Sequence, residues 1–166
     1  MNTLETGDLI LYHCKKGWFG KLIQFFTRSD YSHVGIVLKD PSFTDPKMVG
    51  LYFWESSDEH CRDAENDKFK IGVEIVDLET AIKDAYRRNT DDLYYRKLKN
   101  KPAFSNDTLK EIHNVVHNKP YDFVPKDWIE ALIQKDPDPQ KTDRFWCSAL
   151  VGYVYTKLGL LPADTD

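Results

Sequence analysis

The stretch "YSHVGIVL", Tyr31 to Leu38, decides the fold because it combines strand-forming residues with a single titratable ring. Its valine, isoleucine and leucine residues are typical of a buried β-strand, and the turn-rich "KDPSFTDP" ends that strand. His33 stands at the head of the apolar run. There it is either a hydrogen-bonded core histidine or a catalytic base, and the catalytic role requires a partner elsewhere in the chain.

Further strands and helices are predicted on both sides of this stretch. Apolar or alternating runs bounded by turn residues indicate strands at 6–13, 32–38, 49–57, 71–78 and 93–98. Apolar residues at helical spacing indicate helices at 18–28, 79–88, 105–119, 126–135 and 144–162. Because strands gather in the first part of the chain and helices in the second, the predicted class is α+β with an antiparallel sheet.

Length, charge and cysteine content narrow the class of protein. The 166 residues suffice for one well-buried core, so a single domain spanning 1–166 is expected. The 23 basic and 27 acidic residues are largely interspersed, which disfavours nucleic acid as the main partner. Three cysteines fit a reducing compartment better than a disulfide framework. Without a signal peptide or an apolar run of about 20 residues, the chain is expected to be soluble and cytoplasmic.

Cys147 is the first candidate for chemistry because it falls near the start of the last predicted helix. The unpaired amides and the dipole of a helix N-terminus stabilise a thiolate. The competing interpretation is an inert buried thiol, which is the usual state of a lone cysteine. A nucleophilic thiol requires a base within reach, and a third polar group normally orients that base.

His33 and Glu55 are the candidates for those two roles. Glu55, in "FWESS", is a carboxylate that follows three large apolar residues, which is unexpected on a strand. If the two strands are neighbours, Glu55 accepts a hydrogen bond from the imidazole while the other ring nitrogen faces Cys147. A solvated position at the end of the strand is the other open interpretation of Glu55.

The other histidines favour no metal site. His113 and His117 are four positions apart on a predicted helix, but the helix lacks the His-Glu-x-x-His order and no third ligand is evident. A solvated helix face is therefore the preferred interpretation. The adjacent His-Cys pairs at 13–14 and 60–61 send their side chains to opposite faces when extended, so neither pair is a natural chelate.

Three blocks together resemble the NlpC/p60 superfamily of papain-like cysteine peptidases: "GDLILYH", "SHVGIVL" and "FWCSALVGYVYTKLGLLP". Members of that superfamily have a Gly-Asp-Leu strand, a Ser-His-Val-Gly-Ile strand and an Asp-Cys-Ser-Gly-Leu-Val helix. Here the histidine block precedes the cysteine block, an order similar to that of the circularly permuted branch with its YiiX/YebB-like and poxvirus-related proteins. Trp146 and Ala149 depart from the ordinary cysteine motif, and 58–141 carries no matching motif.

The resemblance implies a circularly permuted papain-like fold, with an antiparallel sheet or small barrel packed against helices. It also implies a triad in which Cys147 is the nucleophile, His33 is the general base and then acid, and Glu55 orients the ring. Such a site cleaves or transfers an acyl group from an amide or ester through a thioester. The backbone amide of Cys147 is one expected oxyanion donor, a second donor stays unassigned, and neither metal nor organic cofactor is expected.

Aromatic residues suggest an apolar groove suited to an acyl chain or a hydrophobic peptide, although any single ring could belong to the core. The candidates for contact with substrate are Tyr12, Trp18, Tyr31, Trp54 and Trp146. The expected partner is a small-molecule, lipid or peptide substrate, while peripheral membrane contact and the oligomeric state stay open. Two alternatives to a hydrolase or acyltransferase remain: a binding module that keeps the fold without turnover, and a zinc-bound structural protein.

Overall fold

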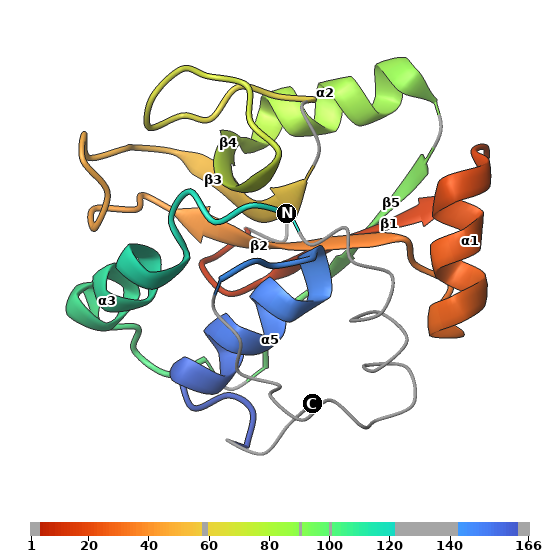
Figure 1. Cartoon of the computed structure of the whole chain (residues 1–166). Coiled ribbons are helices and arrows are strands. Elements are labelled where there is room, and N and C mark those ends of the chain that lie inside the picture. The colour runs from red at the N-terminus through yellow and green to blue at the C-terminus, as the bar shows by residue number, and fades with distance from the viewer. Residues whose placement is uncertain (1–3, 58–59, 90, 100, 122–142, 163–166) are drawn as a thin grey trace.

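The structure is a computed structural model that describes residues 4–57, 60–89, 91–99, 101–121 and 143–162 (Figure 1). The strands of these ranges are β1 (Leu9–Cys14), β2 (His33–Lys39), β3 (Leu51–Ser57), β4 (Gly72–Asp77) and β5 (Asp91–Arg96). Their helices are α1 (Trp18–Thr27), α2 (Leu78–Arg88), α3 (Asn106–Val116) and α5 (Cys147–Lys157).

The five strands form one antiparallel sheet in the order β4-β3-β2-β1-β5, so the strand that carries the histidine motif lies at its centre. This arrangement confirms the α+β class and the antiparallel sheet. The alternative of a small barrel is wrong for the described chain, because β4 and β5 are the two outer strands and do not pair with each other.

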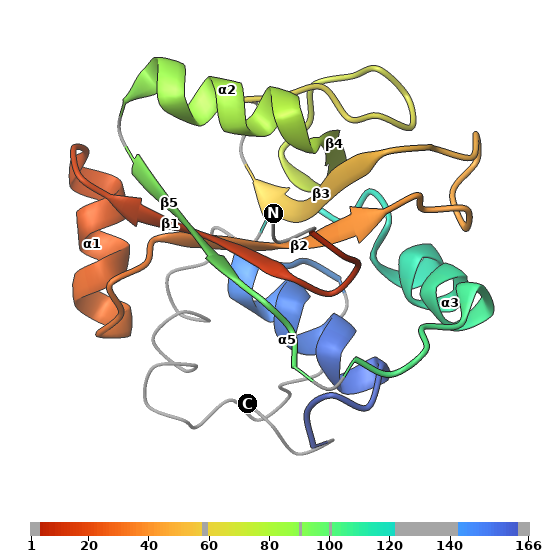
Figure 2. The ribbon, with the colours of Figure 1, turned by 180° about the vertical axis from the view of Figure 1, so that it is seen from behind.

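Helices cover the two faces of the sheet, with α3 and α5 on one face and α2 on the other (Figures 1 and 2). Alternate strand residues face each layer. The first layer buries Ile36, Leu38, Trp54, Val73 and Ile75 against Leu109, Ile112, Val116, Leu150, Val151 and Val154. The second layer buries Ile10, Tyr12, Val37, Phe53 and Val76 against Leu78, Ala81 and Ala85.

The ends of the helices follow the capping residues in the sequence. Asp77 caps α2 by accepting from the amide of Thr80, and Ser105 caps α3 by accepting from the amide of Asp107. The last helix begins at Cys147 rather than at the predicted position 144, since the preceding residue is still extended. The predicted helix at 126–135 lies outside the described residues.

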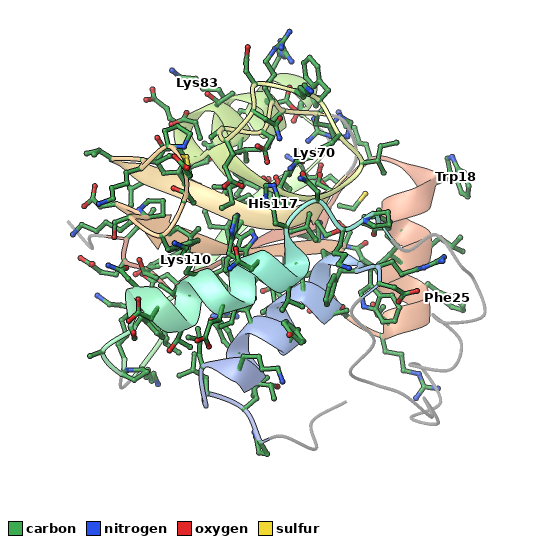
Figure 3. The ribbon with its side chains drawn as sticks, turned by 60° about the vertical axis from the view of Figure 1, so that its left-hand side comes forward. Trp18, Phe25, Lys70, Lys83, Lys110 and His117 are labelled. Carbon is green, nitrogen blue, oxygen red and sulfur yellow. The ribbon has the colours of Figure 1, made fainter. Side chains whose placement is uncertain are left out.

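The apolar side of α1 differs from the core-facing sides of the other helices. Trp18 and Phe25 are 78% and 76% exposed, and both side chains project from the outer side of the helix (Figure 3). In the parts of the chain that the structure describes, none of the helices has both the length and the apolar character needed to cross a bilayer.

Candidate active site

His33 and Glu55 meet where β2 runs beside β3. Because Ile36 lies opposite Trp54 in this antiparallel pair, His33 and Glu55 form a diagonal pair on the same face of the sheet. Nε2 of His33 contacts Oε2 of Glu55, and the two side chains are only 19% and 7% exposed. A carboxylate in this position fixes the orientation of the ring and leaves Nδ1 as the nitrogen that can serve another group.

Aromatic rings hold His33 from two sides. Tyr12, opposite His33 on β1, contacts the imidazole edge-on at 5.1 Å between ring centroids. Phe53 of β3 makes a similar contact at 6.3 Å. The imidazole therefore has little freedom to rotate away from Glu55.

Cys147, the first residue of α5, is the third member of this group. Burial alone would raise the pKa of its thiol, but the hydrogen bond and the charge of His33 lower it below the ordinary value, with help from the backbone amides of Val34 and Ser148. For the imidazole of His33, burial alone would lower the pKa. The hydrogen bond and charge of Cys147, followed by those of Glu55, raise it well above the ordinary value. These two opposite pKa shifts favour a thiolate beside an imidazolium.

The start of α5 is attached to the sheet through a buried hydrogen bond. Ser56 of β3, next to Glu55, donates from Oγ to the carbonyl oxygen of Phe145 at 2.6 Å. Phe145 also donates its amide to the carbonyl of Pro120 at 3.0 Å. These bonds fix the chain two residues before Cys147, so the same strand positions the carboxylate and the entry to the cysteine helix.

A cavity of about 190 Å³ opens beside His33 and Glu55. Residues of α1, α2, β1 and the segment after β3 complete its wall, among them Tyr12, Cys61 and the ion pair of Asp84 with Arg88. This volume is below the roughly 300–1,000 Å³ of pockets for drug-sized ligands. The cavity therefore has room for a short acyl or side-chain group.

The five aromatic residues predicted to contact substrate are not gathered at one place. Of these, Tyr12 lines the cavity. Tyr31 contacts the ring of Tyr94, Trp146 precedes α5 as its N-cap residue, and Trp18 projects from α1. Trp54 is fully buried against Phe43 on the opposite face, so its position is at odds with the predicted substrate contact.

Glu74 is a member of the site region that the sequence did not single out. It lies opposite Glu55 in the β3–β4 register, is 2% exposed, and neither of its carboxylate oxygens has a hydrogen-bond partner in the described structure. Burial, together with the negative charges of Glu55 and Asp63, raises the pKa of Glu74 to about 9. It is therefore protonated at neutral pH.

A second cluster of ligating side chains lies at the C-terminal end of α3. Oε2 of Glu65 is 3.0 Å from Nε2 of His113 and 3.1 Å from Nδ1 of His117. The expected solvated helix face is wrong for His113, which is buried against Phe43 and Trp54. The sequence did not reveal Glu65 as a third ligand, because it lies 48 positions from His113 in a stretch without a motif.

Comparison with known proteins supports the fold. No protein-family model matches the sequence, and no curated protein matches it significantly. The structure is similar to the crystal structure of the metalloprotein YiiX from Escherichia coli O157:H7, with a TM-score of 0.56 and 23% sequence identity. The alignment covers 94% of this chain and 67% of the YiiX chain. At this identity the likeness shows a YiiX-like fold, in agreement with that part of the sequence resemblance.

Proposed function

We propose that this protein is a cysteine hydrolase or acyltransferase of the permuted NlpC/p60 type, with Cys147 as nucleophile, His33 as base and acid, and Glu55 as the orienting group. The observation that carries the proposal is the buried chain of contacts from Glu55 through His33 to Cys147. An isolated core histidine needs one hydrogen-bond partner. Here both sides of the ring are engaged, by a carboxylate and by a thiol whose pKa is lowered.

The reaction follows from the protonation states that the site favours. The thiolate of Cys147 attacks the carbonyl carbon of an ester or amide, and the backbone amide of Cys147 at the start of α5 donates to the developing oxyanion. The imidazolium of His33 gives its proton to the departing alcohol or amine, which leaves a thioester on Cys147. Water or a second nucleophile then loses a proton to His33 as it attacks the thioester, and the thiolate is released.

The size of the cavity favours a substrate that places a short group beside His33 and Glu55. The walls combine the Tyr12 ring with the charged pair of Asp84 and Arg88, so the cavity suits a group with both apolar and polar parts. Ester and amide substrates with a short acyl group are therefore expected to react before those with a long, rigid one. Lipid-like acyl compounds remain the first substrate class, and peptide or isopeptide bonds the second.

Product release from a panel of acyl esters, amides and peptides tests this function. Wild-type protein and the Cys14→Ser variant are expected to release product from at least one member, because Cys14 is not part of the triad. Cys147→Ser is expected to release none. Mass spectrometry of a slowly turned-over ester should show the acyl group on Cys147. Turnover that survives in Cys147→Ser contradicts the proposal, and binding without turnover across the panel favours the alternative of a binding module.

A further inference from the structure

We propose that Glu65, His113 and His117 form a zinc site that fastens the segment between β3 and β4 to the end of α3. Three potential ligand atoms converge there, one from each residue, and all lie within 4.8 Å of one another. Two imidazoles and one carboxylate are a set that suits Zn²⁺ and is poorly suited to Mg²⁺ or Ca²⁺. This site revises the sequence-based expectation that the chain binds no metal.

Two of the three distances between ligand atoms are close to those in a zinc site, and the third, between the two ring nitrogens, is at most 4.8 Å. In a tetrahedral site with bonds of about 2.1 Å, neighbouring ligand atoms lie about 3.4 Å apart. The carboxylate oxygen of Glu65 is 3.0 and 3.1 Å from the two ring nitrogens, so small side-chain movements would admit the ion. The side chain of His117 is 32% exposed, which gives water access to a fourth position.

The residues are held in place by their surroundings. The ring of His113 packs against Phe43 and Trp54, with centroid distances of 5.6 and 6.2 Å. His117 is the C-cap residue of α3, and its amide donates to the carbonyl of His113 at 2.7 Å. The two histidines therefore approach the same point from consecutive turns of one helix, with one ring anchored in the core.

Glu65 is held by a separate buried carboxylate. Asp63, fully buried, accepts hydrogen bonds from the amides of Glu65, Asn66 and Ile75. Lys70 forms an ion pair with Asp63 at 2.8 Å. These contacts fix the backbone at Glu65 relative to β4, so the third ligand is preorganised rather than carried on a free loop.

The position of the cluster separates the metal from the proposed acyl chemistry. Trp54 packs on His113, whereas Glu55, the next residue along β3, faces His33 on the other side of the sheet. Zinc at Glu65 would connect segments 48 positions apart in the sequence. Because the three ligands come together only in the folded chain, zinc bound there would stabilise the folded state.

Direct zinc titration tests the site. Protein freed of metal with a chelator and then dialysed is titrated with Zn²⁺ in competition with a chromophoric chelator. We expect one zinc ion per chain, and an affinity that falls at least about tenfold in Glu65→Gln and in His117→Ala. Zinc should also raise the melting temperature of the wild-type protein and leave that of the two variants nearly unchanged.

Two control variants separate this site from other zinc ligands. Glu111→Gln removes an exposed carboxylate from α3 and should bind zinc like the wild type. Cys147→Ser should also bind normally, so the result does not depend on the proposed acyl chemistry. Glu65→Gln preserves the size of the side chain, and circular dichroism can verify that this variant is folded. Absence of zinc binding, or binding that weakens in Cys147→Ser but not in His117→Ala, would overturn the proposal.

Discussion

Glu55 on β3 and Glu74 on β4 lie opposite each other in a buried part of the sheet, yet only Glu55 has a partner there. His33 contacts Glu55, whereas both carboxylate oxygens of Glu74 lack hydrogen-bond partners in the described structure. Two adjacent buried carboxylates cannot both ionise without a large cost in free energy. With its pKa raised to about 9, Glu74 is neutral at neutral pH, and Glu55 is the carboxylate that contacts the imidazole.

This arrangement predicts that the titration of Glu74 makes the stability of the protein depend on pH. Its pKa is raised from the ordinary 4.5 to about 9 in the folded protein, so the folded state binds more protons between these values than the unfolded state does. Stability should therefore fall as pH rises through this window, with a slope of at most about 1.4 kcal/mol per pH unit from this group. Glu74→Gln removes the titration and keeps the shape.

Urea unfolding between pH 5 and about 9 measures the effect. The variant Glu74→Gln should gain stability relative to the wild type as pH rises, while the exposed Glu111→Gln should follow the wild type throughout. A constant difference between Glu74→Gln and the wild type over this range would show that Glu74 does not hold a proton in the folded protein.

Replacing Glu55 with glutamine should narrow the pH range over which the protein turns over substrate. The charge of Glu55 contributes to the raised pKa of His33, so its removal lowers that pKa and destabilises the imidazolium. We expect turnover to fall by about 10²–10⁴-fold and the alkaline limb of the pH profile to move to lower pH. A merely structural role for Glu55 would lower the rate without moving this limb, and that outcome would argue against an electrostatic effect on His33.

Gly35 of the central strand is expected to tolerate no side chain. A Cβ there would lie 2.5 Å from the ring of Phe53 and 2.8 Å from the carbonyl oxygen of Trp54. Gly35→Ala should therefore destabilise the protein by about 1–3 kcal/mol in urea unfolding. Gly152 in α5 offers a matched control, since a Cβ there meets nothing within 4 Å. Gly152→Ala should be stabilising by about 0.5–1 kcal/mol, and equal effects of the two changes would contradict the packing argument.

Much of the fold could be predicted from the sequence because its signals are local. Strand alternation, turn residues and apolar residues at helical spacing predicted the order of the elements and many of their boundaries. The triad candidates could also be found, because Cys147, His33 and Glu55 combine unusual residue types with positions at the ends of elements. Their convergence depends on strand order, which the structure supplies: β2 pairs with β3, and α5 packs across both.

The sequence does not reveal which helices cover each face of the sheet, and the burial of several residues depends on this. Alternation places Trp54 and Glu55 on opposite faces, but it does not say that α3 and α5 cover the Trp54 face. For the same reason, alternation predicts that Glu74 is a solvent-exposed polar residue of its strand. In the structure both faces of β4 are buried. Glu65 joins His113 only through the tertiary packing of its loop, so no sequence spacing could reveal this cluster.

The rate of Cys147 alkylation as a function of pH tests the central claim most directly. Burial raises the pKa of Cys14, and burial with nearby carboxylates raises that of Cys61 to about 12, so neither competes as a thiolate. With limiting iodoacetamide at neutral pH, mass spectrometry should find Cys147 labelled first. In His33→Ala the rate should fall at least about tenfold and its pH midpoint should rise, because the interaction that lowers the thiol pKa is lost. Preferential labelling of Cys14 or Cys61, or an unchanged profile in His33→Ala, would contradict a thiolate–imidazolium site.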